Sequence, residues 1–375
     1  MRVAILTLPL HINYGGIMQC YALQRVLTRM GHDVKVLSKP MYGRLYFFAL
    51  FRSYISYLYY KYIRKENISS KSVLYDLYQY RNVSKNLNFF VKNNIIKYNK
   101  RKWETIGSNF DAIIVGSDQV WRAAYHSNIE EYYLSFIGEL DIKRISYAAS
   151  FGLDNLKEYS MHKLKLCTRL LKKFDYVSVR EDSGVLLCKE YFGVKAELVI
   201  DPTLLLDDKD YETIFNNSNL KIDKNILLAY FLDITDEKIK IAERLAQYKG
   251  LKLFIINSKA FDDKSEIKER IMIGVDEWLF NFKNSSYIIT DSFHGCVFSI
   301  IFKKQFIALG NDNRGLTRFL SLLNRFSLND RLINLDIRFE SILNVVDKNI
   351  DYNTVYDKLS KEREKSYNFL YNSLK

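Results

Sequence analysis

A single histidine carries the clearest signal of acid–base chemistry in this sequence of 375 residues. His294 lies in the segment Asp291-Ser292-Phe293-His294-Gly295, between a predicted strand over 287–290 and an apolar helix. A histidine gains and loses a proton near neutral pH, and the start of a helix attracts anions. The segment predicts a proton-transfer site in which Ser292 and Gly295 help to hold a phosphate, although a lone histidine is more often structural.

Three arginines are candidate ligands for an anion. Arg180 ends a predicted strand over 176–179, and its guanidinium can hold a phosphate or a carboxylate through two hydrogen bonds. Arg314 and Arg318 stand at the start of a later predicted helix, where two cations suit a dianion. The alternatives are an Arg180–Glu181 pair that caps the next helix and a solvated helix start at Arg318.

Two further polar clusters follow predicted strands and could hold an acceptor that carries hydroxyl groups. The first has two glycines that let the backbone approach a ligand closely, and it comprises Asn13, Tyr14, Gly15, Gly16 and Gln19. The second comprises Ser117, Asp118 and Gln119, and Asp118 could also deprotonate a hydroxyl. The alternatives are a tight turn for the first cluster and a helix cap beside a core Trp121 for the second. We favour a ligand contact for Asp118 and a core position for Trp121.

The composition excludes several other classes of protein. Hydrophobic residues make up 48% and charged residues 26%, which is typical of a globular protein. The formal charge of +13 favours anionic partners, but no zinc-ribbon, RNP-type or basic-zipper pattern occurs, so we expect no nucleic acid partner. No spacing fits a metal site, a GxSxG elbow or a P-loop, and we expect neither a metal nor a cofactor. The four cysteines are widely separated and indicate buried thiols in a reducing compartment.

Alternating strands and helices predict the elements that position these residues. A buried strand over 3–8, a helix that ends at Gly31 and a strand over 34–37 form a βαβ unit. A second α/β series begins near residue 224. We therefore predict an α/β fold with two Rossmann-like domains that face a cleft. The predicted division is an N-terminal domain over 1–205, a C-terminal domain over 206–350 and a C-terminal helix over 351–375.

Residues 40–105 depart from this alternation. They are rich in Tyr, Asn, Lys and Phe, and we predict a helical insertion with a basic, aromatic surface. The stretch 46–63 contains Arg52 and Lys61 and is too short and too charged to span a bilayer. The first strand lacks the flanking residues of a signal peptide. We therefore expect a cytoplasmic protein.

Taken together, these segments resemble the polysaccharide pyruvyl transferase family. The matching stretches run in order from the N-terminus to about residue 326 and comprise 13–24, 115–121, 146–152, 178–182, 201–205 and 291–295. The resemblance implies a GT-B-like fold and transfer of pyruvate from phosphoenolpyruvate to two hydroxyls of a sugar, which forms a cyclic ketal. It gives most weight to Arg180 and His294 as catalytic residues, and Asp118 completes the predicted set.

The resemblance also implies the partners and the setting. Phosphoenolpyruvate is expected to be held by Arg180, Arg314 and Arg318. The acceptor is expected to be a glycan or a lipid-linked oligosaccharide in exopolysaccharide or capsule biosynthesis. A basic protein suits such an acceptor, and we expect peripheral contact with the inner face of the membrane. Residues 40–105 and the predicted final helix match little of the family, so acceptor specificity is predicted to lie in these two regions.

Two other functions stay open at this point. A GT-B-type glycosyltransferase would have the same architecture and would bind the diphosphate of a nucleotide-sugar with the cations that follow residue 309. A non-catalytic protein of glycan assembly would use the segment 40–105 to dock on a membrane or a partner. Stabilisation of the protein by nucleotide diphosphates would favour the glycosyltransferase. A lack of turnover with any donor would favour the non-catalytic protein.

Overall fold

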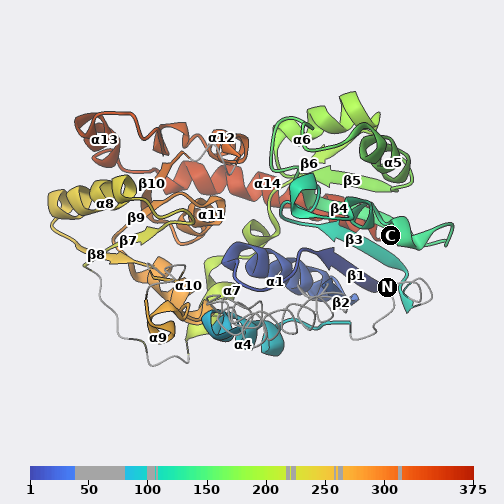
Figure 1. The fold of residues 1–375 in the computed structure, drawn as a ribbon, viewed down its shortest axis with the longest axis horizontal. Coiled ribbons are helices and arrows are strands. Elements are labelled where there is room, and N and C mark those ends of the chain that lie inside the picture. Colours follow the sequence, from blue (N-terminus) through green and yellow to red (C-terminus); the bar gives the residue numbers. More distant parts are fainter. Residues whose placement is uncertain are drawn as a thin grey trace, which may run out of the picture.

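Two parallel β-sheets form the framework of the two lobes seen in Figure 1. The computed structural model describes the residues 1–38, 81–98, 106, 109–216, 220, 225–256, 259–260, 265–310 and 315–375. Most of the predicted insertion over 40–105 lies outside these residues. Within them, each lobe follows the expected alternation of strands and helices.

The N-terminal sheet has six parallel strands in the order β2-β1-β3-β4-β5-β6. Its central strands β1 and β3 are mostly apolar and are buried on both faces, as parallel strands under helices must be. The order reverses direction between β1 and β3, so the carboxyl ends of these strands border a crevice. The strands are β1 (Arg2–Thr7), β2 (Asp33–Ser38), β3 (Ala112–Gly116), β4 (Lys143–Ala149), β5 (Tyr176–Val179) and β6 (Glu197–Leu198).

The C-terminal sheet has five parallel strands in the order β11-β10-β9-β7-β8. The strand order reverses between β7 and β9, which places a second crevice at the carboxyl end of β9. The strands are β7 (Ile226–Tyr230), β8 (Lys252–Ile255), β9 (Tyr287–Thr290), β10 (Gln305–Leu309) and β11 (Leu332–Ile333).

The helices of the first lobe are α1 (Tyr14–Arg29), α4 (Lys85–Asn94), α5 (Met161–Leu171) and α6 (Asp182–Leu187). Two of them begin at a capping side chain. Asn13 caps α1 by accepting a hydrogen bond from the Gly16 amide at 3.2 Å, and Ser160 caps α5 by accepting from the Lys163 amide. The next helix, α7 (Asp208–Phe215), packs against the second lobe, where its Tyr211 ring lies 5.0 Å from that of Phe298.

The second lobe repeats the pattern. The helix after β7 runs from a Thr235 cap to Gly250, a glycine with φ 64° that ends the helix in the left-handed conformation. The helices are α8 (Asp236–Lys249), α9 (Ile267–Arg270), α10 (Val275–Asn284), α11 (Phe293–Ile301), α12 (Leu316–Arg325) and α13 (Phe339–Val346). The chain passes from the first sheet to the second between the end of β6 at Leu198 and the start of β7 at Ile226. The domain boundary predicted at 205/206 lies between these two strands.

The last helix, α14 (Tyr352–Ser373), joins the two lobes (Figure 1). At its start the Tyr352 hydroxyl donates to the Ser299 carbonyl in the C-terminal lobe at 3.1 Å. Near its end Phe369 packs on Tyr147 of the N-terminal sheet, with ring centroids 6.2 Å apart. A helix that is fixed in both lobes restrains their relative position.

A shared core also connects the lobes behind the crevice. Tyr14 of α1 stacks on Trp278 of α10 with ring centroids 5.0 Å apart, and the Tyr14 hydroxyl donates to the Ile273 carbonyl. Gly152 and Gly315 meet across the interface so closely that a Cβ on Gly315 would lie 2.0 Å from the Gly152 carbonyl oxygen. Only glycine fits at that point, because φ of Gly315 is also positive at 82°.

None of the helices in the described part of the chain has the length and apolar character that a membrane crossing needs.

Candidate functional site

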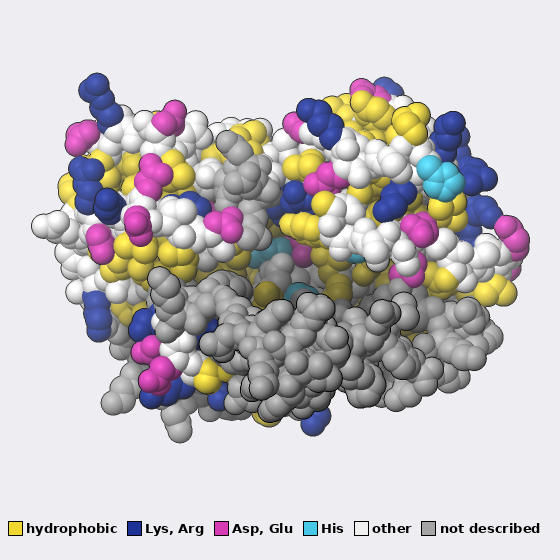
Figure 2. Space-filling view, viewed as in Figure 1, with side chains coloured by type: hydrophobic (Ala, Val, Ile, Leu, Met, Phe, Trp, Pro, Cys, Tyr) yellow, Lys and Arg dark blue, Asp and Glu magenta, His cyan; other side chains and the backbone are white. Residues whose placement is uncertain are grey.

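Five charged or titratable side chains meet where the carboxyl ends of the two sheets face each other. Asp118 follows β3, Arg180 follows β5 and Asp201 follows β6, while His294 begins α11 after β9 and Arg318 lies in α12 after β10. Strand ends of this kind are where open α/β sheets bind their ligands. Figure 2 shows a hollow between the lobes with acidic and histidine side chains at its floor.

Arg180 is the centre of a buried ion cluster. Its Nη1 atom lies 2.6 Å from an Asp201 oxygen and its Nη2 atom 3.1 Å from an Asp118 oxygen. Its Nε atom lies 3.7 Å from Glu181. The Arg180 residue is only 5% exposed, so these charges depend on one another for their stabilisation. A donor carboxylate that binds Arg180 therefore has to displace one of these carboxylates or share the guanidinium with it.

The pKa values of the cluster follow from burial and from this pairing. Burial alone would raise the pKa of Asp201, but His294 and Arg180 outweigh it and hold the pKa well below its usual range. Burial lowers the pKa of Arg180, but the neighbouring carboxylates raise it by more, so the pKa of Arg180 lies above its usual value. The pKa of Glu181 is raised, because its burial outweighs the attraction of Arg180. Asp201 and Arg180 are therefore ionised at neutral pH.

His294 is linked to Arg180 through one carboxylate. Its Nε2 atom lies 3.6 Å from the same Asp201 oxygen that accepts from Arg180. The imidazole belongs to the C-terminal lobe, whereas Asp201 and Arg180 belong to the N-terminal lobe. The site is thus assembled only when the lobes face each other, and Asp201 is placed to orient the imidazole.

Gly15 makes room for this imidazole. It lies in the first turn of α1, and a Cβ at this position would be 1.9 Å from the His294 Nδ1 atom. At Gly16, the next residue, a Cβ would only reach ordinary contact with Asp118 at 3.5 Å. The starts of α1 and α11 therefore converge on the site, and both direct the positive end of a helix dipole toward it.

We expect Gly15→Ala to lower turnover by about 10²-fold, because a displacement of the imidazole by roughly 1 Å is enough for such a loss. Gly16→Ala is the matched comparison on the same helical turn and should lose less turnover than Gly15→Ala, because its Cβ would reach only ordinary contact distances. Steady-state rates and thermal unfolding of both variants test this. Equal rates for the two variants would show that Gly15 does not position His294.

Two arginines lie near the ring of Phe293 at the start of α11. The guanidinium carbon of Arg180 lies 4.5 Å from the ring centroid and that of Arg318 lies 5.9 Å away. Burial, and the nearby charge of Arg180, lower the pKa of Arg318 to about 10. Two like charges held this close favour an anion between or beside them. Ser292 makes no capping hydrogen bond through its hydroxyl, which leaves the first amides of α11 uncapped by that side chain.

The space beside Arg180 is small in this arrangement. A void of about 10 Å³ is lined by side chains that include Arg180, Asp201, Phe293 and Arg325. That is room for about one water molecule. A three-carbon phosphate does not fit in this void, which neither His294 nor Arg318 lines.

Several predicted acceptor residues serve the framework instead. Tyr14, Gln19 and Ser117 have no exposed surface. The Gln19 amide donates to the Thr7 hydroxyl and accepts from the Ser117 amide, and the Ser117 hydroxyl donates to the Ala148 carbonyl. Direct acceptor contact by these three residues does not fit this arrangement, because every one of these polar groups already bonds within the protein.

Three further predicted residues, Asn13, Gln119 and Gly295, lie in the described part of the chain. Asn13 is exposed beside α1, and Gln119 accepts a hydrogen bond from Arg122. Gly295 packs so tightly on β9 that a Cβ would lie 2.2 Å from the Thr290 hydroxyl. Arg314 lies outside the described residues. The ligand roles assigned to these residues stay predictions.

The second polar cluster separates into a core residue and a site residue. Trp121 is fully buried and donates to the Tyr132 carbonyl at 3.1 Å, which confirms its predicted core position. Asp118 does not cap a helix, because the next helical turn is the 3-10 helix Ala123–Tyr125, whose cap position is Arg122. It adopts a left-handed backbone conformation with φ 64°, which aspartate tolerates better than most residues and which often occurs at functional sites.

Asp201 is a site residue that the sequence pattern alone does not single out. Its two oxygens accept from Arg180, Ser117 and both polar groups of Thr203, and it has 2% exposure. The available signal was its position directly after a predicted strand, followed by Pro202-Thr203. Among the described residues, no group of three His, Cys, Asp or Glu side chains is arranged to hold a metal ion. Chemistry without a metal or cofactor stays a prediction.

Comparison with known proteins adds a family and a fold. The family model described as polysaccharide pyruvyl transferase matches residues 13–313. The UDP-GlcNAc 2-epimerase from Neisseria meningitidis, solved with UDP-GlcNAc bound, aligns over 100% of this chain and 99% of its own with a TM-score of 0.50 and 12% identity. At that identity the likeness shows the fold alone. It confirms the predicted arrangement of two Rossmann-like domains in a GT-B-like fold.

Other solved structures are similar over most of the chain. The UDP-GlcNAc 2-epimerase from Methanocaldococcus jannaschii, in complex with UDP-GlcNAc and UDP, covers 92% of this chain and 92% of its own, with 13% identity and a TM-score of 0.47. The spinosyn rhamnosyltransferase SpnG, complexed with spinosyn aglycone, covers 99% of each chain, with 11% identity and a TM-score of 0.49. No curated relative matches the sequence.

Proposed function

The chain belongs to the polysaccharide pyruvyl transferase family, and from that premise we propose that it transfers pyruvate from phosphoenolpyruvate to two hydroxyls of a glycan sugar, forming a cyclic ketal. Membership of this family makes the chain a transferase. The observation that best supports the finer proposal is the shared carboxylate of Asp201, which connects the His294 imidazole with the Arg180 guanidinium across the two lobes.

The donor requires cations, because phosphoenolpyruvate carries a carboxylate and a phosphate. Arg180 and Arg318 provide two guanidinium groups near the ring of Phe293. The amides at the start of α11 provide further donors for phosphate oxygens. We place the phosphate at this end of α11, near His294, and the donor carboxylate toward Arg180.

The proposed reaction begins with a proton on the donor. Protonation of the methylene carbon turns it into a methyl group and leaves an oxocarbenium-like centre at C2. One sugar hydroxyl forms a bond to C2 and loses its proton, and the bond from C2 to the phosphate oxygen then breaks. The second hydroxyl forms a bond to C2, loses its proton and closes the ketal. The two protons lost by the hydroxyls balance the proton taken up by the methylene carbon and the proton on the released phosphate. The products are the ketal and one hydrogen phosphate. His294 is the group that we assign to these proton transfers, with Asp118 as the candidate that orients the diol.

The acceptor and the setting are parts of the same proposal. A glycan or lipid-linked oligosaccharide of exopolysaccharide or capsule biosynthesis would offer the required pair of neighbouring hydroxyls. The charge of +13 suits peripheral contact with the inner face of a membrane, and we place the reaction on the cytoplasmic side.

Ligand-dependent thermal unfolding tests the choice of donor. We expect phosphoenolpyruvate to stabilise the protein, by about 2.7 kcal/mol at a hundredfold excess over its dissociation constant, because it binds only the folded state. UDP should give no comparable stabilisation. Stabilisation by UDP and not by phosphoenolpyruvate would replace the proposal with a glycosyltransferase that uses a nucleotide-sugar.

A further inference from the structure

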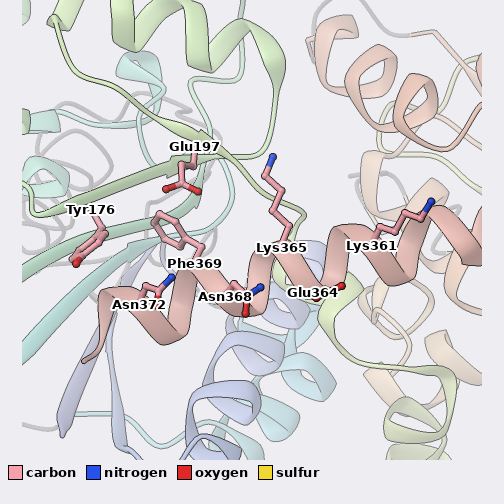
Figure 3. A pocket seen from close by; sticks show the side chains of 8 residues that line it. All are labelled: Tyr176, Glu197, Lys361, Glu364, Lys365, Asn368, Phe369 and Asn372. Atoms are coloured by element: carbon pink, nitrogen blue, oxygen red, sulfur yellow. The ribbon is translucent and has the colours of Figure 1, made fainter.

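A groove of about 460 Å³ lies on the N-terminal lobe, away from the site described above (Figure 3). One wall is the exposed face of α14, and the other is formed by the first residues of β5 and β6, Tyr176 and Glu197. Arg180 follows the opposite end of β5. The groove and the ion cluster are therefore at opposite ends of the same strand, and the reaction proposed above does not use the groove.

An aromatic side chain with a fixed orientation forms part of the groove. Tyr176 is 37% exposed, and its ring lies edge-on to Phe369 of α14, with centroids 6.3 Å apart at 90°. Phe369 is buried and packs in turn on the buried ring of Tyr147 at 6.2 Å. Because Tyr176 is braced by this packing, a ligand that stacks on it would lose little side-chain entropy in doing so.

The rest of the groove is polar and balanced in charge. Two carboxylates, two ammonium groups and two amides line it, from Glu197, Glu364, Lys361, Lys365, Asn368 and Asn372. None of the four charged side chains forms an ion pair with another residue in the described part of the chain. The α14 residues recur at spacings of three and four, so they form one stripe along the helix. Hydrogen-bond donors and hydrogen-bond acceptors therefore line the same groove.

From this composition we infer that the groove binds a neutral sugar unit of a glycan. A pyranose ring has an apolar C–H face that stacks on an aromatic ring and a rim of hydroxyls that both donate and accept hydrogen bonds. The equal numbers of carboxylates and ammonium groups disfavour an anion such as a nucleotide, and the polar rim disfavours an acyl chain. The inference rests on the proposed function, because it takes the glycan acceptor as the source of the ligand and gives that glycan a second point of attachment.

Saturation-transfer NMR with the full-length protein tests this site. The probes are methyl β-D-glucopyranoside, methyl β-D-galactopyranoside and methyl N-acetyl-β-D-glucosaminide. We expect saturation of at least one probe by the wild-type protein and a loss of about fivefold or more in Tyr176→Ala, because the stacking surface is removed. Tyr191→Ala is the matched control, since Tyr191 is 52% exposed in the same lobe and does not line the groove.

The outcomes separate this inference from the proposed function. Saturation that is lost in Tyr176→Ala but kept in Tyr191→Ala and His294→Ala supports a sugar site at the groove, whether or not phosphoenolpyruvate is turned over. The absence of saturation for all three probes would overturn the inference, and so would an equal loss in the two tyrosine variants. Thermal unfolding of Tyr176→Ala shows whether the lobe is still folded. If it is not, the same saturation measurement on Asn372→Ala, which changes another residue of the groove, tests the site, and we expect the saturation to fall there too.

Discussion

Replacement of His294 by asparagine is expected to lower pyruvyl transfer by about 10²–10⁴-fold, the range that a positioned acid–base group contributes. Asparagine keeps a polar side chain beside Asp201 but cannot exchange a proton near neutral pH. The imidazole lies within 3.6 Å of Asp201 and beside the start of α1, so its loss affects the centre of the site. Steady-state release of phosphate from phosphoenolpyruvate in the presence of acceptor measures the effect.

The control for this variant is a second polar residue on the same helix. Ser299→Ala removes a buried hydroxyl that donates only to the Gly295 carbonyl within α11, and it should leave turnover close to that of the wild type. Thermal unfolding should show that His294→Asn is folded. If His294→Asn turns over at the rate of Ser299→Ala, the imidazole is not the acid–base group.

Replacement of Asp201 by asparagine is expected to affect both stability and turnover. Removal of one partner from a buried ion pair costs about 3–5 kcal/mol, and we expect about 3 kcal/mol here because Asp118 and Glu181 still face Arg180. Turnover should fall as well, by about 10²-fold, because His294 loses the group that orients it. Chemical denaturation and steady-state kinetics measure the two effects.

The pH dependence separates the Asp201 charge from a simple packing role. The folded protein holds the pKa of Asp201 below its usual value, so the carboxylate stabilises the fold above its unfolded pKa of about 3.9, and this contribution is lost as the pH falls toward the folded value. The stability difference between wild type and Asp201→Asn should therefore be largest near pH 7 and should narrow below about pH 4. A difference that does not change with pH would mean that Asp201 acts through packing alone.

Asp291→Asn is a matched control for these effects. Asp291 is also fully buried and paired, with its oxygen 2.6 Å from Lys238 in the C-terminal lobe. It holds the loop after β7 through the amides of Leu232 and Asp233. This variant should lose stability in a similar way, but its turnover at a temperature where it is folded should fall less than that of Asp201→Asn.

The positions of the site residues along the chain could be predicted because they follow from strand ends. Buried apolar runs identify strands such as β3 and β9, and the residues after them must lie at the carboxyl edge of a parallel sheet. This reasoning placed Asp118, Arg180 and His294 at the crevice, where the structure has them. It needs only local sequence and the geometry of α/β folds.

Partners across the fold could not be predicted in the same way. Asp201 contacts Arg180 because β6 pairs with β5, and it contacts His294 because the second lobe faces the first. Neither contact can be deduced from the spacing of residues along the chain. From the sequence, Tyr14 is predicted to contact a ligand. In the structure α1 packs between the lobes, and the Tyr14 ring is buried against Trp278.

We propose that this ion cluster and its histidine catalyse the transfer of pyruvate from phosphoenolpyruvate to a glycan diol. The most direct test incubates the protein with phosphoenolpyruvate and with polysaccharide isolated from cells that lack the protein, and follows both phosphate and glycan mass. We predict that each phosphate released accompanies a gain on the glycan equal to pyruvic acid minus one water, and that His294→Asn abolishes both. Release of phosphate without that gain, or no change with any such glycan, would contradict the account.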